Sequence, residues 1–297
     1  SISTTMVPIE YQGAEGKVKI NLLDTPGYFD FVGEVEEAVS VADAAIIVVN
    51  CKAGIEVGTE KAWELCEEYR LPRIIFVTNM DDDHASFREL ILKLEKQFGR
   101  KIAPFQVPIR ENEKFVGFVN AVKMEGRRFT NLSDYEECEI PEYTKKNLGI
   151  IRDALIEAVA ETSEEYMERY FSGEEFTQDE ILYCRTDQRL PGNIVPVMMG
   201  SGINCQGFHA LLNAIDRYFP SPDEAGECIG VDVSNGERFT AKYNDEVSLS
   251  AKVFKTVVDP FIGKYSLMKI CTGVLKPDST IYNSIRRRRK DRQGLCF

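Results

Sequence analysis

Short apolar runs alternate with helix-period segments over the first hundred residues, and this alternation constrains the fold more than any other feature. Residues 19–23, 45–49 and 73–77 read KINLL, AIIVV and RIIFV, which are runs of strand length. Residues 59–69 and 86–98 place apolar side chains three or four positions apart, as amphipathic helices do. Strands that alternate with helices predict an α/β fold with a parallel sheet covered on both faces.

The pattern changes near residue 105 and returns near residue 190. Residues 115–122 are a further expected strand, and residues 140–171 read as a long, charged, helical segment. The alternation then resumes with a buried strand at 194–199 and a helix at 207–218. We therefore expect an α+β subdomain, at about residues 105–190, inserted into the α/β domain.

A Pro-rich segment, FPSPD at residues 219–223, reads as a linker. The sequence beyond it is strand-rich, with candidate strands at 247–256, 265–271 and 279–285. We expect one domain over residues 1–221 and the start of a β-barrel domain over residues 222–297.

Composition narrows the function classes. The formal net charge of −12 argues against broad, non-specific nucleic-acid binding, and we expect no DNA partner. No apolar run is long enough for a membrane helix, and we expect no membrane partner. The eight cysteines form no CxxC pair and there are two histidines, so a zinc site has little to build on. Reduced structural thiols in a cytoplasmic, monomeric protein are the expectation.

The stretch NLLDTPGYFDF at residues 21–31 raises the main functional question. In open α/β sheets, ligands bind at the carboxyl ends of the strands, and Asp24 stands at such an end. A carboxylate there can hold Mg²⁺ through water, and Gly27 lets a backbone amide approach a phosphate. The alternative is a plain strand-to-helix turn in which Asp24 caps the helix.

The DTPG motif and the sequence YFDFVGEVEEAVSVADAAIIVVN that follows resemble the third conserved box of translational GTPases, closest to elongation factor G and its ribosome-protection and release-factor relatives. The resemblance covers nearly the whole chain, because the inserted subdomain and the start of the second domain, LSAKVFKTVVDPFIGKYSLMKICTGVLKPDSTIYNS, follow in the family's order. It implies a P-loop NTPase-like fold that binds GTP or GDP with Mg²⁺.

The resemblance assigns roles residue by residue. Ser1 falls where the family has a Mg²⁺-ligating Thr, although a frayed end explains Ser1 equally well. Asp24 would support Mg²⁺ through water, and Gly27 would offer its amide to the γ-phosphate. Asp81 would accept from guanine N1 and the exocyclic amine, and the backbone of Ser201 and Gly202 would reach guanine O6. Alone, the Ser201-Gly202 pair could be an ordinary turn.

Three departures accompany the resemblance. No GxxxxGK[ST] phosphate loop occurs, from which we expect truncation upstream of Ser1, and the end of the β domain also looks incomplete. Tyr28 replaces the family's His after DTPG; a phenol is no base at neutral pH but can order water, or it can be a packed aromatic. In the fourth box, NKMD is replaced by TNMD, so Asn79 stands where the family has a Lys that stacks on the base.

We expect a translational GTPase that couples GTP hydrolysis to translocation on the ribosome. The basic run at residues 286–290 would contact ribosomal RNA, or it is a charged strand end. Two alternatives stay open: a ribosome-binding regulatory factor with slow or absent hydrolysis, and a ribosome-protection or release-factor-like GTPase.

Overall fold

The computed structural model describes residues 1–14, 16–130, 134–183, 194–224, 228–231, 235–261, 263–277, 279–283 and 288–291. The chain divides into two compact units, Ser1–Phe219 and Pro220–Phe297, so that the division falls inside the FPSPD segment. Each unit is described by itself below.

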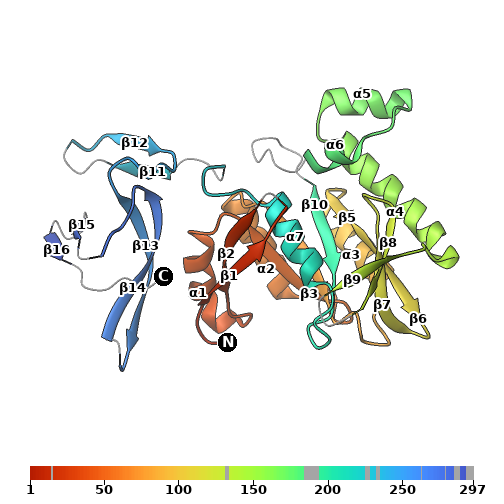
Figure 1. Ribbon diagram of the computed structural model, residues 1–297, viewed down its shortest axis with the longest axis horizontal. Coiled ribbons are helices and arrows are strands. Elements are labelled where there is room, and N and C mark those ends of the chain that lie inside the picture. The colour runs from red at the N-terminus through yellow and green to blue at the C-terminus, as the bar shows by residue number, and fades with distance from the viewer. Residues whose placement is uncertain are drawn as a thin grey trace. The chain divides into compact units, whose positions relative to one another are not determined.

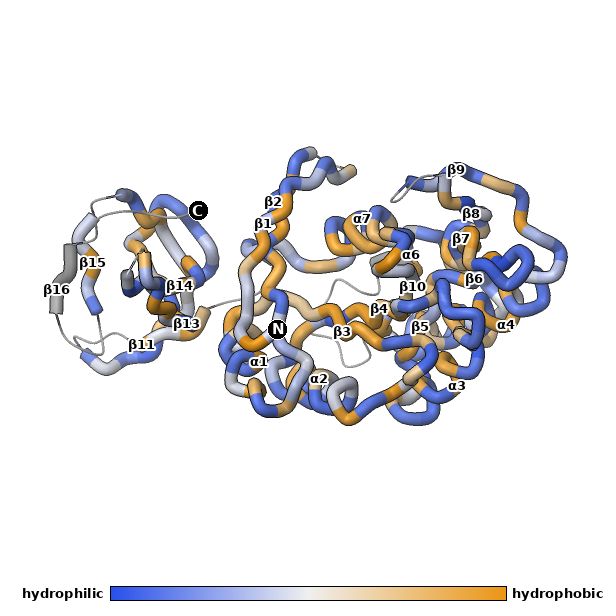
Figure 2. Tube along the Cα trace, turned by 90° about the horizontal axis from the view of Figure 1, so that it is seen from below, coloured by the Kyte–Doolittle hydropathy of each residue, from blue (hydrophilic) through white to orange (hydrophobic). Residues whose placement is uncertain are grey.

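A four-stranded parallel sheet organises the first unit, in the order β3-β4-β10-β5 (Figure 1). Its strands are β3 (Ala45–Asn50), β4 (Arg73–Thr78), β5 (Ile102–Pro104) and β10 (Val195–Met199). The register pairs Val49 with Val77 and Met199 with Val77, so β3, β4 and β10 end at the same edge. Figure 2 shows β3 and β4 as hydrophobic along most of their length. The predicted parallel α/β sheet is confirmed.

Helices cover both faces of this sheet, as the alternation predicts. Alternate β4 residues face opposite sides: Ile75 and Val77 pack in the cluster that includes α2 (Val57–Glu68) and α3 (Phe87–Phe98). Ile74 and Phe76 pack in the cluster of α7 (Phe208–Tyr218). In a sheet with helices on both faces, successive side chains of a strand must be buried on opposite sides, and those of β4 are.

The DTPG segment ends a separate antiparallel hairpin, β1 (Thr5–Gln12) with β2 (Lys17–Asp24). Within the described residues this hairpin has no ladder to the parallel sheet. A single 3₁₀ turn, η1 (Phe29–Phe31), and helix α1 (Val32–Val39) follow. The tip of the hairpin is fastened to α7, since the amide of Ala14 donates to the Asp216 carboxylate at 3.1 Å.

An antiparallel sheet and three helices lie between β5 and β10 in sequence. The sheet has the order β6-β7-β8-β9, and α4 packs on its first strand. The elements are β6 (Gln106–Glu111), β7 (Lys114–Asn120), β8 (Glu125–Phe129), β9 (Tyr135–Cys138), α4 (Glu142–Ala160), α5 (Glu164–Ser172) and α6 (Gln178–Tyr183).

The helical segment expected over residues 140–171 consists of two helices, because the chain breaks between α4 and α5. The Thr162 hydroxyl donates to the Val159 carbonyl at 2.6 Å, and Ser163 Oγ accepts from the Tyr166 amide at 3.1 Å. Side chains that bond to the nearby backbone end one helix and cap the next.

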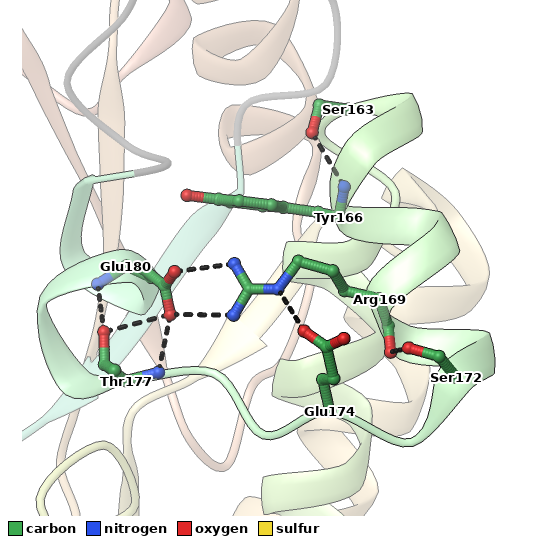
Figure 3. A network of polar contacts seen from close by, with 7 residues as sticks. All are labelled: Ser163, Tyr166, Arg169, Ser172, Glu174, Thr177 and Glu180. Carbon is green, nitrogen blue, oxygen red and sulfur yellow. Dashed lines mark hydrogen bonds and ion pairs between the residues drawn. The ribbon is translucent and has the colours of Figure 1, made fainter.

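Arg169 fastens α5 to α6 (Figure 3). Its guanidinium donates to both Glu180 carboxylate oxygens, at 2.6 and 3.3 Å, and to Glu174 at 3.2 Å. Thr177 and Glu180 form a capping box, in which the Thr177 amide donates to Glu180 and the Glu180 amide donates to the Thr177 hydroxyl. Arg169 and the Thr177 amide together lower the pKa of Glu180 to about 2.

Antiparallel pairs make up the second unit, as expected for its strand-rich sequence. They are β11 (Cys228–Val231) with β12 (Arg238–Ala241), β13 (Ser250–Asp259) with β14 (Gly263–Thr272), and β15 (Thr280–Asn283) with β16 (Arg288–Asp291). Across the described ranges, no helix is both long and apolar enough to cross a membrane.

Candidate nucleotide-binding site

The loops after β3, β4 and β10 meet at the carboxyl edge of the parallel sheet. The amide of Cys51 donates to the carbonyl of Thr78 at 3.0 Å, and the amide of Met80 donates to the carbonyl of Gly200 at 3.2 Å. These backbone bonds bring together Asn79, Asp81 and the Ser201-Gly202 turn, which sequence reasoning placed in one base-binding site. In α/β proteins this edge is where ligands bind.

Asp81 presents an unused acceptor at this edge. Its Oδ1 atom is excluded from water and has no hydrogen-bond partner among the described residues. A buried carboxylate oxygen without a donor is unfavourable by about 1–3 kcal/mol or more, so such atoms are rare in stable proteins. Asp81 as a whole is only half-buried, so its carboxylate is open to a ligand that brings its own N–H donors.

The turn after β10 can be built only with glycines at its ends. A side chain on Gly200 would lie 2.3 Å from the Gln206 carbonyl oxygen, and Gly207 has a φ of +86°. Between them Ser201 is fully buried and exchanges two backbone bonds of 3.0 Å with Gln206. A Cβ on the exposed Gly202 would come 3.9 Å from the Thr78 hydroxyl, which places this turn beside the end of β4.

Two residues at the carboxyl end of β3, which sequence reasoning did not select, contact the loop after β4. Asn50 Nδ2 donates to Asn79 Oδ1 at 3.2 Å, and Lys52 Nζ pairs with Asp82 at 3.2 Å. The amide of His84, then Lys52, lowers the pKa of Asp82. Asn50 is the last residue of β3 and Lys52 lies two residues beyond it, and a polar residue at the end of a buried strand was the available signal. The order of the strands in the sheet determines which neighbouring loop such a polar side chain contacts.

Arg110 of β6, in the inserted sheet, forms hydrogen bonds with the loop after β4. Its Nη2 atom donates to the carbonyls of Met80, at 2.7 Å, and Ala85, at 3.3 Å. Tyr143 of α4 holds the Arg110 backbone, since its hydroxyl accepts from the amide at 3.0 Å and donates to the carbonyl at 2.7 Å. Sequence reasoning missed Arg110, because nothing local predicts a contact across thirty residues.

The residues expected at phosphate and metal lie at the end of the hairpin. The register pairs Thr5 with Asp24, so the segment that begins at the exposed Ser1 leaves β1 where Asp24 ends β2. Asp24 is exposed, and a Cβ on Gly27 would meet nothing within 4 Å. The Gly27 carbonyl lies 4.0 Å from a Cβ built on Gly58, which places the turn against the first turn of α2.

Tyr28 follows in extended backbone, as the residue before η1, and its side chain is 72% exposed. The described structure shows no hydrogen bond from its hydroxyl. The packed-aromatic alternative is therefore poorly supported for the free protein, because a packed ring would be buried.

No cluster of three or more His, Cys, Asp or Glu side chains that could hold a metal is found among the described residues. An exposed carboxylate such as Asp24 nevertheless suits Mg²⁺, which is commonly held by one or two carboxylates together with water and substrate phosphates. The basic run at residues 286–290 lies largely outside the described residues, since only the backbone of 288–290 is described, in β16.

Comparison with known proteins places this geometry in context. The family described as the elongation factor Tu GTP binding domain matches residues 1–221. A curated relative, the elongation factor G-like protein of Thermotoga maritima, is 34% identical over 283 residues, which are 95% of this chain and 40% of that protein. The chain thus spans less than half the length of this relative.

A solved structure agrees with this relationship. The crystal structure of a protein from Thermus thermophilus matches with a TM-score of 0.77 and 32% sequence identity. The match covers 94% of this chain and 38% of that one.

Proposed function

Because the chain belongs to the translational GTPases that carry the elongation factor Tu GTP-binding domain, we propose that it recognises guanine nucleotides at the carboxyl edge of its parallel sheet. Asp81 is the acceptor for the guanine N1 and amino donors, and the Ser201-Gly202 backbone faces guanine O6. Asn79 contributes a neutral polar side chain in place of a cation.

The unpartnered Oδ1 atom of Asp81 is the observation that carries this proposal. Guanine offers two adjacent N–H donors, whereas adenine offers a bare acceptor at the equivalent ring nitrogen. A site with a buried carboxylate rejects the wrong base strongly, since that base leaves the carboxylate without donors.

The hairpin end supplies the phosphate side of the proposed site. Asp24 would hold Mg²⁺ through water, with Ser1 as a further hydroxyl ligand, and the ion would neutralise phosphate charge when bound. Gly27 offers its amide to the terminal phosphate, and Tyr28 orders the attacking water without accepting its proton. The space where a Gly27 side chain would stand is open, which supports the close approach of a ligand to the backbone at this residue.

In the cell we propose a monomeric, cytoplasmic protein that acts on the ribosome and couples GTP hydrolysis to translocation, as in elongation factor G. The relationship to an elongation factor G-like protein supports this role. A ribosome-protection or release-factor-like role shares the same nucleotide chemistry.

Binding of a graded ligand series tests the proposal. The chain is titrated with guanosine, GDP and GTP in Mg²⁺, each against its adenine counterpart, by equilibrium dialysis. Since no GxxxxGK[ST] loop occurs in its residues, we expect guanosine and GDP to bind within about tenfold of each other, and adenosine to bind far more weakly. The proposal would be refuted if guanosine and adenosine bound equally well, or if neither of them bound.

Tyr28, in place of the family's His, favours one alternative, a ribosome-binding factor that hydrolyses little GTP. A phenol can order water but, unlike an imidazole, is not a useful base at neutral pH. Turnover measured with and without ribosomes, for the wild type and Tyr28→His, separates the two roles. Ribosome-stimulated turnover that rises in Tyr28→His supports a slow GTPase, whereas binding to ribosomes with no turnover in either supports the factor.

A further inference from the structure

The hydrogen bonds of Asn50 determine which of its amide atoms faces the fourth-box loop. Asn50 Oδ1 accepts from the backbone amides of Lys52, at 2.9 Å, and Ala53, at 3.1 Å. Since a side-chain amide has one oxygen and one NH₂ group, the oxygen is committed to its own loop. The NH₂ group of Asn50 is the atom left to face Asn79.

This arrangement in turn orients Asn79. Asn50 Nδ2 can only donate, so the atom of Asn79 that lies 3.2 Å from it is the oxygen. The NH₂ group of Asn79 must then point to the other side. None of the described residues accepts a hydrogen bond from it. The backbone holds Asn79 in a left-handed conformation, with a φ of 59°, and the Asp82 amide donates to its carbonyl at 3.2 Å.

We propose that Asn50 is a positioning residue for guanine-nucleotide recognition, which fixes the amide of Asn79 as a hydrogen-bond donor toward the nucleoside. The loop after β4 then offers two complementary groups within three residues: the Asn79 NH₂ donor and the Asp81 Oδ1 acceptor. The donor suits an acceptor atom of the nucleoside, and the acceptor suits the guanine N–H groups. This inference rests on the proposed function, because it refines the same site.

The substitution Asn50→Asp changes the orientation of the Asn79 amide while it keeps the hydrogen bonds within the loop that follows Asn50. Its carboxylate keeps both acceptor bonds from the Lys52 and Ala53 amides, but it has no donor for Asn79. The Asn79 amide then rotates, donates to the new carboxylate and turns its oxygen toward the nucleoside. Guanosine is the probe, because it has no phosphate on which the added charge could act. Asn147→Asp, on the exposed face of α4, is the control with the same charge change.

The background Asn79→Gly makes the test specific. Glycine suits the left-handed backbone at this position and removes the amide whose orientation is in question. If Asn50 acts through Asn79, Asn50→Asp weakens guanosine binding about threefold to tenfold in the wild-type background, as expected for one neutral hydrogen bond. It then changes the affinity by less than about 1.5-fold in the Asn79→Gly background, because a double-mutant cycle isolates the coupling.

Each other outcome overturns the inference. An equal loss in both backgrounds would mean that Asn50 acts through its own loop, and no loss in the wild-type background would mean that it does not act at all. A wild-type chain that binds no guanosine refutes the proposed function first, before any variant is compared. If Asn50→Asp lowers the melting temperature markedly, Asn50→Ser replaces it. A serine hydroxyl can cap the same loop but is too short to reach Asn79.

Discussion

Replacing Asp81 with asparagine should move ligand affinity and stability in opposite directions. The Oδ1 atom of Asp81 is shielded from water and lacks a partner in the free protein. Hydrogen bonds to a charged group contribute about 1.5–3 kcal/mol each. In Asp81→Asn one oxygen remains, but the new NH₂ group faces a guanine donor. We expect a loss of about 3 kcal/mol in binding, or about a hundredfold in Kd.

The free protein should not be destabilised by the same change. A neutral amide is less costly to bury without a partner than a carboxylate is. The urea midpoint of Asp81→Asn should therefore equal or exceed that of the wild type, by up to about 1 kcal/mol in free energy of unfolding. A residue that lowers stability while it raises affinity is typical of a binding site, and a purely structural residue would show the reverse.

A panel of nucleosides makes the assay specific. Calorimetric titrations compare guanosine, inosine, which lacks the 2-amino donor, and xanthosine, which has a carbonyl at that position. The wild type should prefer guanosine, and Asp81→Asn should gain affinity for xanthosine, because its NH₂ group can donate to that carbonyl. Asp83→Asn removes the same charge from an exposed neighbour. The reasoning is refuted if Asp83→Asn loses as much guanosine affinity as Asp81→Asn, or if neither variant loses any.

Three further predictions follow from contacts described above. Arg110→Met keeps the aliphatic part of the side chain but leaves the Met80 and Ala85 carbonyls without their donor. Guanosine affinity should therefore fall about threefold to thirtyfold, while the far-ultraviolet circular dichroism spectrum stays unchanged. Unchanged affinity would mean that Arg110 does not support the loop. Because the pKa of Glu180 is lowered to about 2, its stabilising effect is complete above its ordinary pKa and is lost as pH falls toward 2; the melting-temperature difference between wild type and Glu180→Gln should therefore shrink from pH 5 to pH 2, and a constant difference would count against it. Burial raises the pKa of the Cys51 thiol to about 11, so iodoacetamide at pH 7.5 should label the exposed Cys205 much faster than Cys51, as peptide mass spectrometry would show; equal rates would be unexpected.

The parallel sheet could be predicted because each of its main strands carries its own signal. The runs at residues 45–49 and 73–77 are continuous and β-branched, and they became β3 and β4 with one or no added residue at each end. A strand buried on both faces has to be apolar throughout, so its local sequence is sufficient. The start of a helix is less well encoded: the helical spacing is recognised from residue 59, but α2 begins at Val57, and Thr59 Oγ1 accepts from the Glu56 amide at 3.3 Å.

The candidate site was only partly predictable for a different reason. Asp81 and Asn79 lie in a motif whose spacing can be read along the chain. Asn50 and Arg110 act across the sheet and across the insert, and their partners follow from strand order and from the packing of two sheets. Hydrogen bonds between distant loops depend on tertiary geometry, which single-residue patterns do not encode.

The Arg110 contact joins the inserted sheet to the loop that is proposed to hold the guanine base. If the arrangement of Arg110 differs between the empty and the occupied loop, the two are linked, and linkage acts equally in both directions. A macromolecule that binds the insert and favours the arrangement in which Arg110 contacts the loop would tighten nucleotide binding by some factor. The nucleotide would then tighten the binding of that macromolecule by the same factor. A partner bound to the insert would then respond to nucleotide binding, and would change the nucleotide affinity, without contacting the nucleotide.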